Sequence, residues 1–239
     1  MKKECYLGVH VSPLSYEEIL EDIDNRIQEG KQSTLIAVNP EKVMTAQKDE
    51  KLMDLINHAT YQIPDGIGIV LASKLNKGSV TSRVTGVEMM ERLNEHAAKK
   101  GYRVFLYGAS EEVVISAKKT LEGRYPTLCI ADYENGYITD NEQLVQKIND
   151  SKADILFVAM GSPKQELWIY KYMEQLNVKV FQGVGGSFDV LAGKVKRAPE
   201  SFQKLGLEWL YRLMKEPKRI KRQMALPKFL FRILFHTEK

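Results

Sequence analysis

The sequence predicts an α/β protein whose mostly parallel sheet carries helices on both faces. Over the first 193 residues, short apolar runs rich in β-branched residues alternate with amphipathic helical patterns, which is typical of such sheets. A chain of 239 residues is long enough to bury a substantial core. The longest uninterrupted apolar runs, such as residues 155–160, are far shorter than the about 20 residues that a membrane-crossing helix needs.

Strands and helices are predicted to alternate along this part of the chain. A first helix is predicted over residues 15–30, from the spacing of its isoleucines and leucine, and Gly30 ends it. The predicted strands are 34–39, 60–66, 102–109, 127–133, 154–160 and 178–186. Further helices are predicted near 41–58, 86–100, 110–123, 141–150 and 163–176. Because ligands of open α/β sheets bind beyond the carboxyl ends of the strands, the residues that end or follow these strands are the candidate site.

Asp65 is the best candidate for a catalytic base. It ends the apolar part of the strand at 60–66 and precedes Gly66 and Gly68, so its carboxylate is expected at the ligand edge of the sheet, where it could take a proton from a hydroxyl. An ordinary Asp-Gly turn is the alternative. Arg83 precedes a predicted helix and could neutralise a diphosphate through its planar guanidinium. A surface arginine in a loop is the alternative for Arg83.

Two further strand ends have the composition of phosphate or sugar sites. The segment GSPKQE (161–166) is predicted to start a helix with Ser162 at the N-cap, and the free N–H groups there can receive a phosphate or a polar sugar group. The glycine-rich turn at 183–186 lets the backbone approach a ligand, and Asp189 follows at a distance that suits a ribose hydroxyl. Plain helix capping and a tight turn with a solvated aspartate are the respective alternatives.

The chain is predicted to divide into a catalytic domain, residues 1–194, and a basic amphipathic appendage, residues 195–239. From Lys194 onward there are 13 Lys or Arg against 4 Asp or Glu, whereas the whole chain has a net charge of only +4. This charge is mixed with large apolar side chains, which suits an anionic membrane surface better than nucleic acid. The residues expected to face the membrane headgroups are Ile220, Met224, Phe229, Leu230, Ile233 and Leu234, beside Lys228 and Arg232. A packing or dimer surface is the alternative, and the oligomeric state stays open.

Other classes of site lack support in the sequence. The chain has neither a G-x-G-x-x-G motif after its first strand nor a P-loop motif. Asp22 and Asp24 form a D-x-D, but they lie within a helix on a solvated face, and the four histidines are scattered, so no metal and no cofactor is expected. Cys5 and Cys129 lack metal-type spacing and the N-terminus lacks a signal-peptide core, which favours a reduced cytoplasmic setting.

An ordered set of motifs closely resembles the WecG/TagA/CpsF family of bacterial glycosyltransferases. The resemblance extends from about residue 6 to about residue 224. The motifs are VNPEKVM (38–44), IPDGIGIV (63–70), RVTGVEMM (83–90), LYGAS (106–110), GSPKQE (161–166), GVGGSFDVLAG (183–193), RAPE (197–200), GLEWLYRL (206–213) and EPKR (216–219).

The resemblance implies a Rossmann-like domain that transfers a sugar, with inversion and without a metal, from a UDP-sugar to a polyprenyl-diphosphate-linked acceptor. The TagA branch uses UDP-N-acetylmannosamine and undecaprenyl-diphosphate-linked N-acetylglucosamine, in the first committed step of wall teichoic acid linkage-unit synthesis. This implies a peripheral position on the inner face of the plasma membrane. Related enzymes use N-acetylmannosaminuronic acid, glucose or galactose. A nucleotide-dependent oxidoreductase and a non-catalytic membrane scaffold are the alternatives outside the family.

The family's functional residues fall on definite positions of this chain. Asp65 is expected to be the base, with Asn39, Arg83 and Gln165 beside it in the catalytic set. Asp189 is expected to face the nucleotide. The appendage arginines expected to close over the diphosphate are Arg212, Arg219 and Arg222. The other candidate substrate-binding residues are Gly108, Ser162, Lys164, Gly185 and Gly186. One position departs from the family pattern, because many members have a threonine where this chain has Ala37.

Overall fold

The computed structural model describes residues 2–217 and 220–235 and contains a six-stranded parallel sheet. The strands lie in the order β4-β3-β8-β7-β5-β6, and every neighbouring pair is parallel. Their bounds are β3 (Ser33–Val38), β4 (Tyr61–Pro64), β5 (Arg103–Gly108), β6 (Cys129–Glu134), β7 (Ile155–Ala159) and β8 (Val180–Gly183). The predicted fold class is therefore confirmed. Each of these strands lies within a predicted one, apart from Ser33 at the start of β3 and Glu134 at the end of β6.

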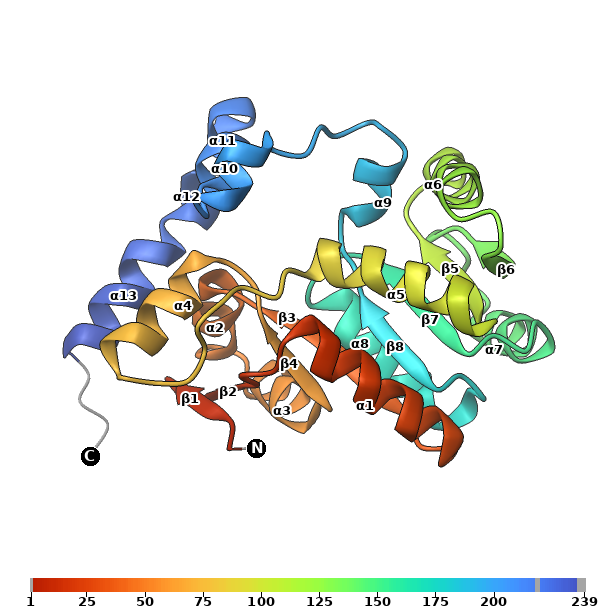
Figure 1. The fold of residues 1–239 in the computed structure, drawn as a ribbon, viewed down its shortest axis with the longest axis horizontal. Coiled ribbons are helices and arrows are strands. Elements are labelled where there is room, and N and C mark those ends of the chain that lie inside the picture. Colours follow the sequence, from red (N-terminus) through yellow and green to blue (C-terminus); the bar gives the residue numbers. More distant parts are fainter. Residues whose placement is uncertain (1, 218–219, 236–239) are drawn as a thin grey trace.

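Helices cover both faces of this sheet (Figure 1). Those of the first 193 residues are α1 (Tyr16–Gln28), α2 (Pro40–Ala46), α3 (Glu50–His58), α4 (Ile67–Leu75), α5 (Gly86–Lys100), α6 (Glu111–Arg124), α7 (Asn141–Asp150), α8 (Lys164–Tyr172) and α9 (Ser187–Leu191), with a 3-10 turn at Met173–Gln175. The appendage contains α10 (Glu200–Lys204), α11 (Glu208–Lys215), α12 (Ile220–Gln223) and α13 (Ala225–Phe235).

Alternate residues of the central strands enter separate cores. Val104 and Leu106 of β5 pack with α1, α5 and α6 on one face, whereas Phe105 and Tyr107 pack with α7 and α8 on the other. This period of two is the geometry of an extended strand. Both faces of the central strands are apolar because both are covered by helices, which explains why these strands occur as continuous apolar runs.

The structure differs from the sequence prediction at three places in the first 80 residues. A hairpin of β1 (Glu4–Tyr6) and β2 (Val9–Val11), with Leu7 and Gly8 at positive φ, was not predicted, because strands of three residues show no periodicity. Helix α4 was not predicted because its sequence is almost wholly apolar. The single helix predicted over 41–58 is two helices, and the Asp49 side chain caps the second by accepting a hydrogen bond from the Leu52 N–H.

The last helix belongs to the core of the protein. Helix α13 packs against α2 and α4 (Figure 1), and Phe229 is completely buried, with its ring edge-on to Tyr6 at 6.3 Å. Leu226 lies so close to Gly68 that a side chain at Gly68 would meet it at 2.6 Å. The prediction that Phe229 faces lipid is therefore wrong, because that side chain is buried in the core with Tyr6 and the apolar residues of α2. Leu230 and Ile233, which were also expected to face the headgroups, are partly buried against the same core. In the described part of the chain, no helix has both the length and the hydrophobicity to span a membrane.

Candidate active site

The candidate site is built at the carboxyl edge of four neighbouring strands. Asn39 follows β3, Asp65 follows β4, and the loop at 160–163 follows β7. The glycine turn that begins at Gly183 follows β8. Since these strands are adjacent and parallel, the residues after them meet at one edge. The structure therefore brings together segments that are more than 100 residues apart in the sequence.

Asn39 and Asp65 lie on adjoining turns. The Asn39 side chain caps α2, because its Oδ1 accepts a hydrogen bond from the Lys42 N–H at 2.9 Å. The Asp65 N–H donates to the Val38 carbonyl at 2.8 Å, so the turn after β4 is tied to the end of β3. Gly66 has a φ of 95°, a backbone conformation that favours glycine. The turn that carries Asp65 is thus tied to the end of β3.

The electrostatic surroundings of Asp65 suit a general base. Burial raises the pKa of Asp65 above its ordinary value, and the charge of Arg212 is the largest opposing influence. Glu208 adds to the increase, whereas Lys42 and Arg83 act against it. A raised pKa makes a carboxylate a stronger base and brings it closer to neutral pH. Arg212 and Glu208 both belong to α11, so the appendage contributes to the surroundings of this carboxylate.

Arg83 connects the loop before α5 to α10 and α11. Its Nη1 lies 3.4 Å from Glu208 Oε1, and its Nη2 donates to the carbonyl of Gln203. Both side chains of the ion pair are largely buried, at 19% and 15% exposure. The guanidinium that is expected to bind a diphosphate is therefore engaged by α11 and by the end of α10 in this structure.

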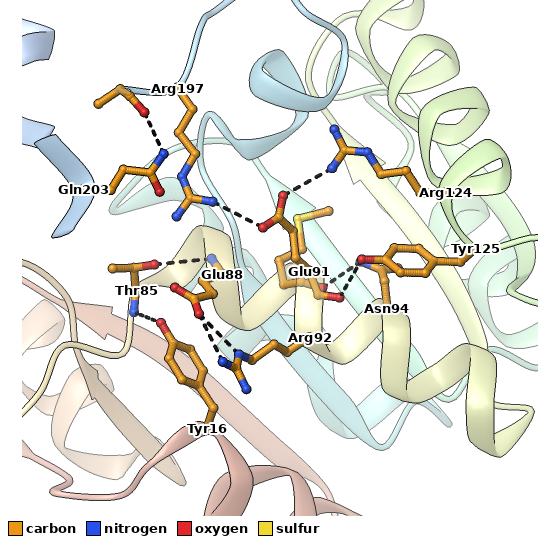
Figure 2. A network of polar contacts seen from close by, with 12 residues as sticks. Tyr16, Thr85, Glu88, Glu91, Arg92, Asn94, Arg124, Tyr125, Arg197 and Gln203 are labelled. Carbon is orange, nitrogen blue, oxygen red and sulfur yellow. Dashed lines mark hydrogen bonds and ion pairs between the residues drawn. The ribbon is translucent and has the colours of Figure 1, made fainter. Parts of the chain in front are cut away.

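The linker before α10 is fastened to α5 by a polar network. Figure 2 shows Arg197 and Arg124 reaching the carboxylate of Glu91 from opposite sides, with nitrogen–oxygen distances of 3.3 and 3.2 Å. The Gln203 amide donates to the Ala198 carbonyl at 2.6 Å. A polar groove of about 560 Å³ opens here, and none of the expected site residues lines it. The groove thus lies where the linker and α10 meet α5.

Gln165 is fixed by hydrogen bonds at both ends of its amide. Its Oε1 accepts from the Gly185 N–H at 3.0 Å, and its Nε2 donates to Glu166 Oε1 at 3.1 Å. A side chain at Gly183 would meet Gln165 Nε2 at 2.4 Å, so glycine is required there for this packing. The turn after β8 therefore accommodates the Gln165 side chain.

Lys42 and Glu166 form a buried ion pair that the sequence did not indicate. Their Nζ and Oε1 atoms are 2.7 Å apart, with side-chain exposures of 8% and 2%. The residues are 124 positions apart, and no spacing signal could have paired them. Lys42 is also among the charges that act on Asp65, which places the pair at the candidate site.

Three other expected residues follow or end the neighbouring strands β7 and β5. Ser162 was predicted to cap α8, and this prediction is wrong. The N-cap is Pro163, and no side chain caps the first turn by a hydrogen bond. Ser162 and Lys164 are exposed. Gly108 has a φ of 116°, and a side chain there would meet the Ala159 carbonyl at 2.4 Å. Glycine is thus obligatory at that strand end.

The remaining candidate substrate-binding residues lie at the start of α9. Gly185 has a φ of 52°, Gly186 is the N-cap of α9, and Asp189 lies in the first turn of that helix. The Asp189 carbonyl accepts a hydrogen bond from the Val195 N–H at 3.1 Å. This contact joins the glycine turn to the start of the appendage.

The appendage arginines have different placements. Arg212 contributes to the electrostatic surroundings of Asp65. Arg222 lies 2.6 Å from Glu41 in the first turn of α2 and so adjoins the Asn39 turn. Arg219 lies outside the described residues. Within residues 2–217 and 220–235, no three His, Cys, Asp or Glu side chains gather as a metal site would require.

Comparison with known proteins identifies the family. A model of the glycosyl transferase WecG/TagA/CpsF family matches residues 4–239. The chain is 38% identical over 202 residues to the N-acetylglucosaminyldiphosphoundecaprenol N-acetyl-beta-D-mannosaminyltransferase of Bacillus subtilis (strain 168), a match that spans 84% of this chain and 79% of that enzyme. It is 39% identical over 232 residues to the enzyme of the same name from Staphylococcus aureus (strain MW2), spanning 95% and 90%. The chain therefore belongs to the WecG/TagA/CpsF family of glycosyltransferases.

Proposed function

We propose that this protein transfers N-acetylmannosamine from UDP-N-acetylmannosamine to undecaprenyl-diphosphate-linked N-acetylglucosamine, the first committed step of wall teichoic acid linkage-unit synthesis. The names and coverage of the relatives support the transferred sugar and the lipid-linked acceptor, and the resemblance to the family supports a UDP-linked donor. The observation that carries the chemistry is the placement of Asp65 at the strand edge, with a raised pKa and with Arg212 and Arg83 around it. A base and a set of cations at one edge are what an inverting transfer to a hydroxyl requires.

The reaction follows from this arrangement. The ionised Asp65 carboxylate accepts the proton of the acceptor hydroxyl as its oxygen attacks the anomeric carbon. The bond from that carbon to the β-phosphate oxygen breaks on the opposite face, so the configuration inverts and UDP leaves with the electron pair. Arg83 and Arg212 would neutralise the charge that develops on the diphosphate. Binding of the diphosphate would exchange the Glu208 partner of Arg83 for phosphate oxygens.

A panel of UDP-sugars offered with a short-chain analogue of the lipid acceptor tests this function. We expect product mass to increase by one N-acetylhexosamine with UDP-N-acetylmannosamine. The other donors in the panel carry N-acetylmannosaminuronic acid, glucose or galactose, and preferential use of one of them would replace the proposed donor within the family. Binding of NAD in place of UDP would contradict the proposal and favour an oxidoreductase. Absence of turnover with every donor would favour a scaffold.

We also propose that the appendage rests on the headgroup region of an anionic membrane, on the cytoplasmic face. The outer side of α13 leaves Phe231, Leu234 and Phe235 exposed, at 62%, 58% and 69%. Lys228 and Arg232 are exposed on the same helix. An apolar stripe beside cations suits shallow docking on anionic lipid, and the lipid-linked acceptor named for the relatives gives such docking a purpose.

Replacing Phe231 and Leu234 together by serine is expected to weaken binding to phosphatidylglycerol vesicles at least about tenfold, because two large side chains lose their burial in lipid. Vesicle co-sedimentation measures the change. Both side chains are exposed, so the fold should persist. Tyr170→Ser, at an exposed aromatic of α8, is the matched control. Unchanged vesicle binding, accompanied by a change from dimer to monomer, would assign this surface to a neighbouring subunit instead.

A further inference from the structure

The buried ion pair of Lys42 and Glu166 joins two elements of the site. Lys42 lies in the first turn of α2 and Glu166 in the first turn of α8, and their charged atoms are 2.7 Å apart. Removing two charges from water is costly, and a well-packed apolar pair is often as stable or more stable. Stability is therefore a weak explanation for this pair.

The hydrogen bonds of the pair are unevenly distributed. Glu166 Oε1 accepts from both Lys42 and Gln165, whereas Oε2 is buried without a hydrogen-bond partner among the described residues. Burial acts to raise the pKa of Glu166, but the charge and hydrogen bond of Lys42, with a contribution from Gln165, lower it below the ordinary value. The ion pair with Lys42 thus keeps this buried carboxylate ionised.

The pair fixes the orientation of the Gln165 amide. Glu166 accepts from the NH₂ end of that amide, and the opposite end accepts the Gly185 N–H at 3.0 Å. An ionised acceptor at Glu166 allows only the NH₂ group to face it, so the amide cannot be reversed. The glycine turn after β8 is held by the same chain of contacts.

The other end of the pair is anchored at the Asn39 turn. The Lys42 N–H bonds the Asn39 side chain at 2.9 Å, while the Lys42 ammonium bonds Glu166 at 2.7 Å. One residue thus connects the end of β3 to the start of α8. Its charge also lowers the pKa of Asp65 against the effect of burial.

We infer that Lys42 and Glu166 are positioning residues of the transferase, which hold Asn39 and the Gln165 amide in fixed geometry around Asp65. The inference rests on the proposed function. Neither residue needs to touch the substrate. Their effect is exerted through the orientation of one amide, the placement of two turns, and the local charge beside the base.

The double substitution Lys42→Met with Glu166→Leu tests the inference. Removing both charges together avoids leaving one of them buried and unpaired, so the variant should fold. We expect kcat to fall about a hundredfold, as for a displacement of catalytic groups by about 1 Å, with a smaller change in KM for the donor. The acidic limb of the kcat/KM profile should move to higher pH, because the Lys42 charge no longer lowers the pKa of Asp65. Thermal melting and near-ultraviolet circular dichroism verify the fold.

A second variant, Lys42→Met with Glu166→Gln, separates orientation from charge. The new glutamine can still accept the Gln165 NH₂ group through its carbonyl oxygen, so most of kcat should return. The charge of Lys42 remains absent, so the shifted acidic limb should persist. Asp24→Asn with Lys100→Met removes an ion pair of 2.9 Å between α1 and α5, near the start of β5 at the opposite edge of the sheet, and should leave kcat and the pH profile unchanged.

The outcomes separate this inference from the proposed function. A wild-type protein that transfers no sugar from any donor contradicts the proposed function before a variant is made. If the wild type is active and the folded Met/Leu variant retains its kcat and acidic limb, the positioning role is refuted. Equal kcat losses in the Met/Leu and Met/Gln variants, at equal melting temperatures, would also refute the role assigned to the Gln165 amide.

Discussion

Asp65→Asn is expected to lower kcat about a thousandfold and to raise the melting temperature. Asparagine has nearly the shape of aspartate but cannot accept the acceptor proton, and general-base catalysis contributes about 10²–10⁴-fold. The residual rate would come from the arginines and from the alignment of the substrates. Product formation with the UDP-sugar and the lipid acceptor measures the loss, and UDP binding should persist because the substitution leaves the diphosphate contacts in place.

The expected gain in stability follows from the direction of the pKa shift. An aspartate whose pKa is higher in the folded chain than in the unfolded chain stabilises the fold at pH values below its pKa in the unfolded chain, which is about 4. This stabilisation is lost as the pH rises through the pKa in the folded chain. Burial of Asp65 gives this direction. At neutral pH the ionised carboxylate therefore weakens the fold, and asparagine should raise the melting temperature by about 2–4 °C, or about 1 kcal/mol.

Two comparisons make the Asp65 prediction decisive. The wild-type kcat/KM should have an acidic limb above the ordinary aspartate range, and the residual activity of the asparagine variant should lack that limb. Asp189→Asn, at a carboxylate expected to face the nucleotide, should change the donor KM more than kcat. Full transfer by Asp65→Asn, with an unchanged acidic limb, would show that another group takes the proton.

Most of the sheet could be predicted from the sequence, because its strands are buried on both faces and therefore contrast with the amphipathic helices between them. Helix α4 lacks that contrast. Its sequence is apolar around much of its circumference. Helix α13 covers part of this apolar surface, whereas Leu71 and Leu75 remain exposed. The hairpin β1–β2 offers strands of only three residues each. In both cases the missing information is the identity of the element that packs against the segment.

The expected site residues could be predicted only as separate strand ends. Parallel topology brings Asn39, Asp65 and Gln165 to one edge, and strand order then makes them neighbours. Lys42 and Glu166 resembled ordinary first-turn residues of two helices, because nothing in a sequence pairs charges that are 124 positions apart. Phe229 lies in a segment that was predicted from the sequence to face the membrane headgroups, yet its side chain is buried beside Tyr6. Amphipathic spacing identifies an apolar face but not the surface that covers it.

Deletion of residues 195–239 is expected to remove at least about 99% of the transfer activity. The deletion takes away Arg212 and Glu208, which act on Asp65, and the partners that hold Arg83. Loss of an oriented cation or donor at a developing charge costs about 10²–10³ in kcat. It also removes Phe229 from its buried position, and loss of a buried phenylalanine costs about 3–5 kcal/mol, so the melting temperature should fall.

A full-length variant separates these two effects of the deletion. Arg212→Ala removes one partly exposed cation and keeps α13 in the core, so its melting temperature should stay close to that of the wild type. We expect its kcat to fall about a hundredfold. The pKa of Asp65 should rise, because the largest influence that opposes its burial is gone, and the acidic limb should move to higher pH. Arg232→Ala, on the exposed side of α13, is the control for loss of an appendage cation and should leave kcat unchanged with a water-soluble acceptor.

The combination of results decides how the appendage acts. If the deletion and Arg212→Ala both lose activity while UDP binding is retained, α11 is part of the catalytic surroundings and the appendage completes the active site. If Arg212→Ala is fully active and only the deletion fails, the appendage acts through stability, because the core has lost the helix that covers Tyr6 and α2. Full activity of a folded deletion variant would contradict both explanations and would place the whole reaction in residues 1–194.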